Sequence, residues 1–100
     1  IPEEIPQLSG WEFAACWHPA RQVSGDFYDF IHHKNQLINL VIADVTDKGM
    51  PAALFMALTR SLVRASIDRS PTLAEGITTA NRLICTDSSL SMPVTLFACE

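Results

Sequence analysis

The first half of the chain shows the alternation of apolar and polar residues that predicts β-strands. Every second residue from Trp11 to Trp17 is apolar, which predicts a strand with one strongly buried face. Two further strand-like runs, at residues 26–31 and 37–43, are joined by a short polar turn at residues 34–36. The second of these runs carries apolar residues at both parities, so we expect it to be covered on both faces.

From Met50 onward the apolar spacing changes to that of an amphipathic helix. We expect one side of this helix to be a buried stripe that consists of Leu54, Leu58, Leu62 and Ala65. The other side is expected to be a charged stripe that consists of Arg60, Arg64 and Asp68. The Ser-Pro pair at residues 70–71 ends the helix. Residues 72–75 then resemble a capping box that opens a second helix.

The second helix is expected to bury the stripe Leu73, Ile77, Ala80 and Ile84. Gly76 lies inside it and costs the helix about 1 kcal/mol relative to Ala. Residues 94–100 then form a final strand. Strands followed by helices favour an α+β fold, in which an antiparallel helix pair covers an antiparallel sheet, over a parallel doubly wound sheet.

The ends of the sequence suggest how the domain is organised. Residues 1–9 are acidic and punctuated by proline, which is typical of a linker that leads into a domain. Residues 10–100 carry all the expected elements, and the last of them is a strand with nothing after it. We therefore expect residues 10–100 to be the N-terminal portion of a domain whose C-terminal portion is absent from this sequence.

Charge and cysteine content narrow the possible partners and compartment. The net charge of -4, with seven basic residues that are scattered along the chain, gives no footprint for nucleic acid or for an anionic membrane. The longest apolar run falls far short of the roughly 20 residues of a membrane span, and no signal peptide is visible. Cys16, Cys85 and Cys99 show no CxxC spacing and lie in apolar stretches, which favours reduced core residues in a cytoplasmic protein.

Two aspartates stand at the outer ends of the predicted hairpin. With a three-residue turn, antiparallel counting pairs His33 with Leu37 and, further out, Asp26 with Asp44. Directly opposed like charges destabilise a sheet pair, so a cation is expected to compensate them. The alternative is that each Asp only ends a strand or caps a turn.

The chemistry of these groups favours a hard cation. Carboxylate oxygens suit Mg²⁺ or Mn²⁺, whereas zinc prefers His or Cys. The adjacent His32 and His33 point to opposite faces of an extended chain and lie at the turn, far from the aspartates. The helix that begins near Met50 also directs its N–H groups and positive dipole end toward the aspartates, which suits a phosphate.

The motifs around both aspartates resemble those of the bacterial PP2C-like serine phosphatases of the sporulation and stress-response class. The matching segments are residues 19–29 (PARQVSGDFYD), 40–54 (LVIADVTDKGMPAAL) and 92–97 (MPVTLF). The resemblance extends over nearly the whole chain from Leu8 onward. It implies that the fold is part of a PP2C-like α-β-β-α sandwich.

The resemblance also implies an activity, a cofactor and roles for particular residues. It implies a metal-dependent protein serine/threonine phosphatase in which two Mn²⁺ or Mg²⁺ ions activate a water that attacks phosphoserine or phosphothreonine. By position, Asp44 would bridge the ions, Asp26 would bind one, and the backbone carbonyl of Val45 would complete part of the shell. The family's remaining acidic ligands lie on strands beyond Glu100, so this chain alone is expected to be inactive.

Three other residues near the motifs have two interpretations each. Arg21 would bind the substrate phosphate or be a solvated loop residue. Asp47 would be a turn residue or an acceptor for a water on the metal. Asp29 lies three residues from Asp26 and so on the opposite face of a strand, where it would be a turn residue or a hydrogen-bonding group behind the ligands.

The resemblance implies a place in bacterial signal transduction and sigma factor regulation. The expected partners are a phosphorylated regulatory protein of the anti-sigma antagonist type and an upstream sensory or dimerising domain, with a homodimer possible. Two alternatives remain open. The chain could be a non-catalytic phosphoprotein-binding or regulatory scaffold domain, or a sensory module.

Overall fold

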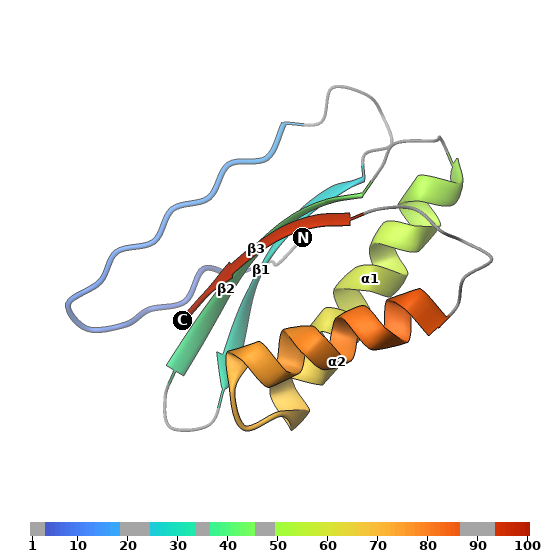
Figure 1. The fold of residues 1–100 in the computed structure, drawn as a ribbon. Helices are drawn as coiled ribbons and strands as arrows, with labels where there is room; N and C mark the ends of the chain where they lie inside the picture. Colours follow the sequence, from blue (N-terminus) through green and yellow to red (C-terminus); the bar gives the residue numbers. More distant parts are fainter. Residues whose placement is uncertain (1–3, 19–24, 34–36, 46–49, 87–93) are drawn as a thin grey trace.

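The computed structural model describes residues 4–18, 25–33, 37–45, 50–86 and 94–100. The elements are β1 (Asp26–His33), β2 (Leu37–Val45), α1 (Met50–Arg69), α2 (Leu73–Thr86) and β3 (Val94–Cys99). The three strands form one antiparallel sheet in the order β1-β2-β3 (Figure 1). The predicted α+β class is confirmed. The predicted turn at residues 34–36 lies outside the described residues.

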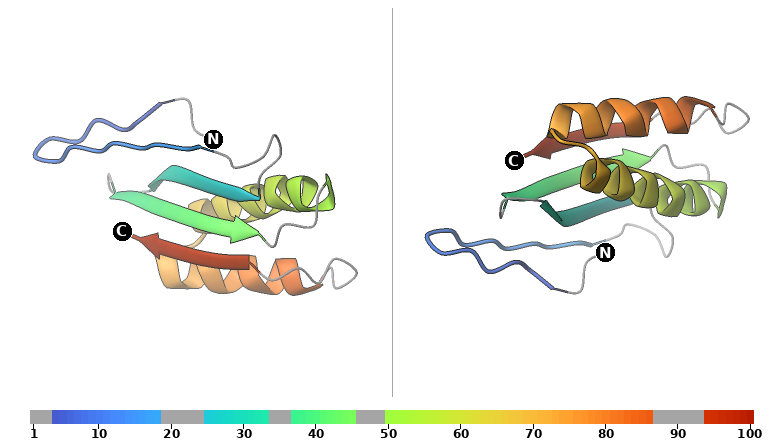
Figure 2. Two further views of the ribbon diagram at one scale, coloured as in Figure 1. Left: turned by 90° about the horizontal axis from the view of Figure 1, so that it is seen from above. Right: turned by 90° about the horizontal axis from the view of Figure 1, so that it is seen from below.

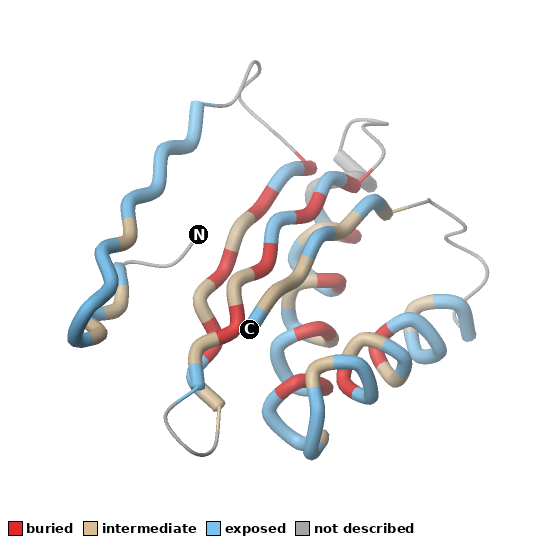
Figure 3. Tube along the Cα trace, turned by 60° about the vertical axis from the view of Figure 1, so that its left-hand side comes forward, coloured by how far each residue is buried: buried red, intermediate tan, exposed pale blue. Residues whose placement is uncertain are grey.

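Both helices lie on one face of the sheet, which we call the inner face (Figures 1 and 2). The N-terminal segment runs along the opposite, outer face on the β1 side (Figure 2). The core lies between the inner face and the helices, as the buried positions in Figure 3 show. It consists of Phe27, Ile31, Val41, Ala43, Val63, Ile67 and Ala80.

The second helix follows its predicted pattern closely. Thr72 caps it, since its Oγ1 accepts a hydrogen bond of 3.1 Å from the backbone N–H of Glu75. Gly76 is buried against α1, and a Cβ there would lie 2.9 Å from Ile67 Cα. The glycine therefore allows the two helices to approach closely. This close approach comes at the cost of the lower helix propensity of glycine.

The predicted buried stripe of α1 is wrong by about one position. Leu54 is 71% exposed and Leu58 is 38% exposed, whereas the neighbouring Phe55 and Val63 are buried. The physical reason is the position of the arginines: Arg60 and Arg64, expected in solvent, contact the buried Asp29 of β1. This contact turns the helix so that the leucine stripe faces outward.

Coverage of the sheet is one-sided, contrary to the expectation for β2. Its inner positions are buried, but Ile42 on the outer face is 65% exposed, as is Phe97 of β3 at 67%. The structure also assigns no strand to residues 12–18, and Trp11 is 71% exposed. Alternation fixes where side chains point, but a strand also needs a partner for its backbone groups, and a pattern does not supply one.

The cysteine interpretation is partly wrong. All three cysteines are free thiols, but Cys16 and Cys85 are exposed and only Cys99 is half-buried. No helix in the described part of the chain is long and apolar enough to cross a membrane.

Candidate metal centre

The predicted pairing of the two aspartates is confirmed. In the β1–β2 register Asp26 lies directly opposite Asp44, and Asp44 in turn lies opposite Thr95 of β3. The three residues therefore form one row across the outer face, and all three are exposed. Thr95, which the motifs did not single out, places its Oγ1 3.4 Å from the backbone carbonyl oxygen of Asp44, to which it donates a hydrogen bond.

A glycine next to this row brings a backbone carbonyl close to the start of β1. The N–H of Val45 donates a hydrogen bond of 3.2 Å to the carbonyl oxygen of Gly25. A Cβ on Gly25 would lie only 2.5 Å from the Val45 carbonyl oxygen, so no other residue fits there without a shift. The signal available in the sequence was a glycine immediately before Asp26.

These groups fit part of the shell of a hard cation. Asp26 and Asp44 supply carboxylates from directly opposed positions, and the Val45 carbonyl follows Asp44 in the chain. All are oxygen donors, as Mg²⁺ and Mn²⁺ prefer, and Mg²⁺ takes six ligands. Within the described ranges no group of three or more His, Cys, Asp or Glu residues could hold a metal ion. The described donors are therefore a partial set.

Asp29 lies on the inner face, away from the aspartate row, as strand alternation predicted. It is 2% exposed, and Arg64 Nη1 donates hydrogen bonds of 2.7 Å to both of its carboxylate oxygens. Arg60 Nε lies 3.5 Å from Oδ2, and the N–H of Phe30 donates to Oδ1 at 3.0 Å. The interpretation of Asp29 as a turn residue is wrong, because it lies inside β1 and joins that strand to α1.

Two predicted site residues, Arg21 and Asp47, lie outside the described residues. The structure thus brings together Asp26, Asp44 and Val45 and separates Asp29 from them.

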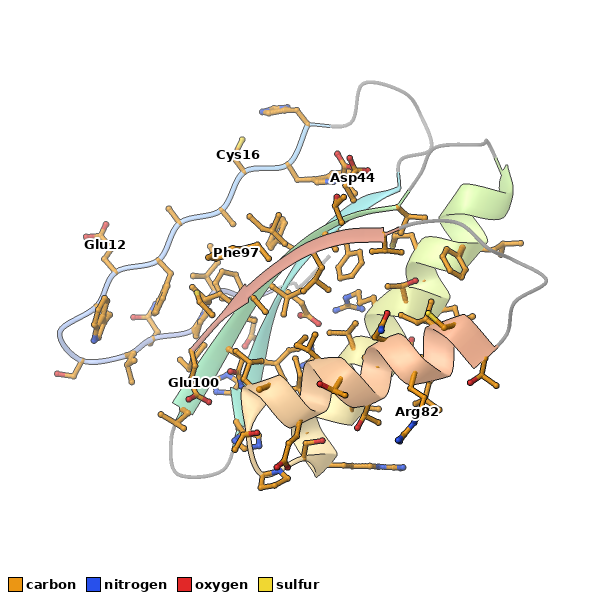
Figure 4. All side chains as sticks on the ribbon, viewed as in Figure 1. Glu12, Cys16, Asp44, Arg82, Phe97 and Glu100 are labelled. Carbon is orange, nitrogen blue, oxygen red and sulfur yellow. The ribbon has the colours of Figure 1, made fainter. Side chains whose placement is uncertain are left out.

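A groove of about 460 Å³ runs along the outer face toward the aspartate row. Its described walls are residues 13–17 on one side and residues 26–30 and 40–44 of the sheet on the other. Phe13 contacts Phe30 edge-to-face, with ring centroids 5.9 Å apart. Figure 4 shows Asp44 and Phe97 on the side of the sheet that faces the segment containing Cys16. The aspartates are therefore at the end of a mostly apolar groove.

Comparisons with known proteins show which family the chain belongs to. The model of the family described as stage II sporulation protein E (SpoIIE) matches residues 34–100. The chain is 35% identical over 98 residues to the phosphoserine phosphatase RsbU of Bacillus subtilis, a match that covers 94% of this chain and 28% of that protein. It is 48% identical over 64 residues to protein IcfG of Synechocystis sp., covering 64% of this chain and 10% of that protein.

The chain thus spans less than a third of the length of either relative. No solved structure matches it. The family match covers more than half of the chain and includes β2, which carries Asp44. The chain belongs to the SpoIIE family of bacterial PP2C-like phosphatases.

Proposed function

We propose that the protein containing this chain is a metal-dependent protein serine/threonine phosphatase that hydrolyses phosphoserine or phosphothreonine on a regulatory protein. The observation that carries this proposal is the register of the hairpin, which sets Asp26 opposite Asp44 on the outer face. A directly opposed carboxylate pair is unfavourable in a sheet unless a cation offsets it. The similarity to a protein named as a phosphoserine phosphatase supports the same reaction class.

The residues of this chain have distinct tasks in the proposed site. Asp44 would bind both ions, Asp26 would bind one of them, and the Val45 carbonyl oxygen would contribute a further donor. When bound, two Mn²⁺ or Mg²⁺ ions lower the pKa of a water and stabilise the oxygens of an in-line displacement at phosphorus, so no protein nucleophile is needed. Gly25 leaves the Val45 carbonyl oxygen uncrowded by a side chain.

Two further roles belong to the proposal. Arg21 binds the substrate phosphate, and Asp47 accepts a hydrogen bond from a water at the site. The remaining ligands come from outside this chain, so the chain alone has little activity.

We also propose a setting for the reaction. The substrate is a phosphorylated regulatory protein of the anti-sigma antagonist type, in the cytoplasm. An upstream sensory or dimerising domain controls the activity. The family match supports this setting, since the family's description is that of a sporulation protein.

The test is turnover of a phosphoserine peptide by the complete protein with Asp44→Asn. We expect a loss of about a thousandfold or more, because the interaction that holds the ions contributes several kcal/mol. Asp68→Asn, which neutralises an exposed carboxylate on α1, is the matched control and should leave turnover unchanged. Unchanged turnover in Asp44→Asn would refute the mechanism. Binding of the peptide by the unsubstituted protein without hydrolysis would instead favour the scaffold alternative.

A further inference from the structure

The hydrophobic pattern of the hairpin does not by itself decide which face meets the helices. On β1 the inner face carries Phe27 and Ile31, and the outer face carries Tyr28 and Phe30. Shifting the pairing by one residue moves every side chain of a strand to the other face. Since both faces of β1 are apolar, such a shift would still bury large apolar side chains.

β2 has the same two-sided character. Val41 and Ala43 are buried on its inner face, while Leu40 and Ile42 stand on the outer face. Neither strand therefore has one clearly apolar face and one clearly polar face. The orientation of the hairpin has to be specified by something other than apolar burial.

Asp29 can specify the orientation of the hairpin, because its environment would differ sharply between the two faces. On the inner face it is 2% exposed and accepts two hydrogen bonds of 2.7 Å from Arg64, with Arg60 Nε at 3.5 Å. A one-residue shift of β1 would carry Asp29 to the outer face and away from both arginines. It would also turn Asp26 toward the helices.

Charged groups buried without partners are strongly unfavourable, whereas paired ones specify register in several systems. Asp29 and Asp26 lie on the same strand at positions of opposite parity, so the placement of one fixes the placement of the other. We propose that the Asp29 cluster, defined as Asp29, Arg60 and Arg64, fixes the register of β1 and thereby positions Asp26 opposite Asp44. Asp29 is then a positioning residue, and only its effect on metal binding rests on the proposed function.

The first readout is the register itself, measured in the complete protein. Tyr28 and Ile42 are directly opposite on the outer face, so Tyr28→Cys with Ile42→Cys forms a disulfide only in the native register. All natural cysteines of the complete protein, Cys16, Cys85 and Cys99 among them, are replaced by Ala in this background. The fraction cross-linked under mild oxidation then reports the fraction of molecules in the native register.

The key variant is Asp29→Leu/Arg60→Met/Arg64→Met. It removes the whole cluster at once, so no charge is left unpaired and the fold is expected to survive even where Asp29→Leu alone does not fold. The second readout is the Kd for Mn²⁺ by calorimetry, on the same variant with Tyr28 and Ile42 unchanged. Asp68→Asn is the control for loss of an acidic charge.

We expect the cross-linked fraction of the triple variant to fall at least about twofold. The Kd for Mn²⁺ should rise by the same factor, since only molecules in the native register bind Mn²⁺. A triple variant that cross-links as fully as the parent overturns the proposal, as does one that fails to fold, because the cluster would then serve stability alone. A lower cross-linked fraction with unchanged Mn²⁺ affinity supports the fixed register and instead contradicts the role of Asp26 in the proposed function.

Discussion

The two faces of the sheet use the same residue type for opposite purposes. On the inner face, Asp29 is almost fully buried and is joined to Arg64 by two short hydrogen bonds. On the outer face, three residues earlier in the same strand, Asp26 is exposed and lies opposite a second carboxylate, that of Asp44. The buried carboxylate stabilises the fold through its arginine partners. The exposed carboxylate pair is the candidate site for a bound cation.

The surroundings of the two faces differ in the same way. The inner face is covered by two helices that pack closely through Gly76, whereas the outer face leaves Ile42 and Phe97 about two-thirds exposed. Successive residues of a strand point to opposite faces of the sheet, so one hairpin can place side chains both in the core and on the outer face. Alternate positions along β1 therefore separate the stabilising residues from the candidate metal ligands.

The largest expected effect is the loss of an apolar side chain from the inner face. Ile31→Ala should lower the free energy of unfolding by about 3–4 kcal/mol, because Ile31 is 2% exposed and its removal leaves a cavity. Leu83→Ala, at an exposed position of α2, should cost less than about 1 kcal/mol. Urea unfolding of the complete protein measures both. An equal loss at the two positions would contradict the burial of Ile31 between the sheet and the helices.

The next effect separates the buried carboxylate from an exposed one. Asp29→Asn should lower the free energy of unfolding by about 3 kcal/mol, since it leaves Arg64 and Arg60 without their anion. Asp68→Asn, on the exposed side of α1, should change it by less than about 0.5 kcal/mol. Thermal unfolding of the two variants beside the parent gives the comparison. Equal stability of both variants would remove the distinction between the two classes of aspartate.

A smaller effect measures how closely the helices cover the inner face. Gly76→Ala improves helix propensity by about 1 kcal/mol, but its methyl group would meet Ile67 Cα at 2.9 Å. We expect a net loss of about 1 kcal/mol in the free energy of unfolding. Ser61→Ala, at an exposed position of α1, has the propensity gain alone and should be neutral or slightly stabilising. Stabilisation by Gly76→Ala would mean that the helices do not pack this closely.

The hairpin and its aspartate row could be predicted from the sequence because they depend on local rules. A short turn and antiparallel counting fix which residues oppose each other, and they place Asp26 with Asp44. The capping of α2 by Thr72 is equally local. The importance of Gly25 and the position of Thr95 were missed, since both follow from contacts between strands that no single motif contains.

The errors have a common cause in tertiary contacts. The leucines of α1 form a regular stripe, yet the Arg64–Asp29 contact between residues 35 positions apart decides which side faces the sheet. The alternating segment from Trp11 to Trp17 pairs only through a single bridge between Trp11 and Leu8, so it forms no strand. Periodicity shows that a residue belongs to a face, but not what that face will meet. The roles of Arg21 and Asp47 stay predictions.

Asp26 and Asp44 are proposed to bind a divalent cation together. The most direct test is the free energy of unfolding of the complete protein and of Asp44→Asn, each measured in EDTA and in Mn²⁺. In EDTA, Asp44→Asn should be at least as stable as the parent, because it removes one of two directly opposed like charges. The parent should gain about 2.7 kcal/mol at a Mn²⁺ concentration of 100 times Kd, and Asp44→Asn should gain almost nothing. A variant that loses stability in EDTA, or that gains as much from Mn²⁺ as the parent, would contradict the account.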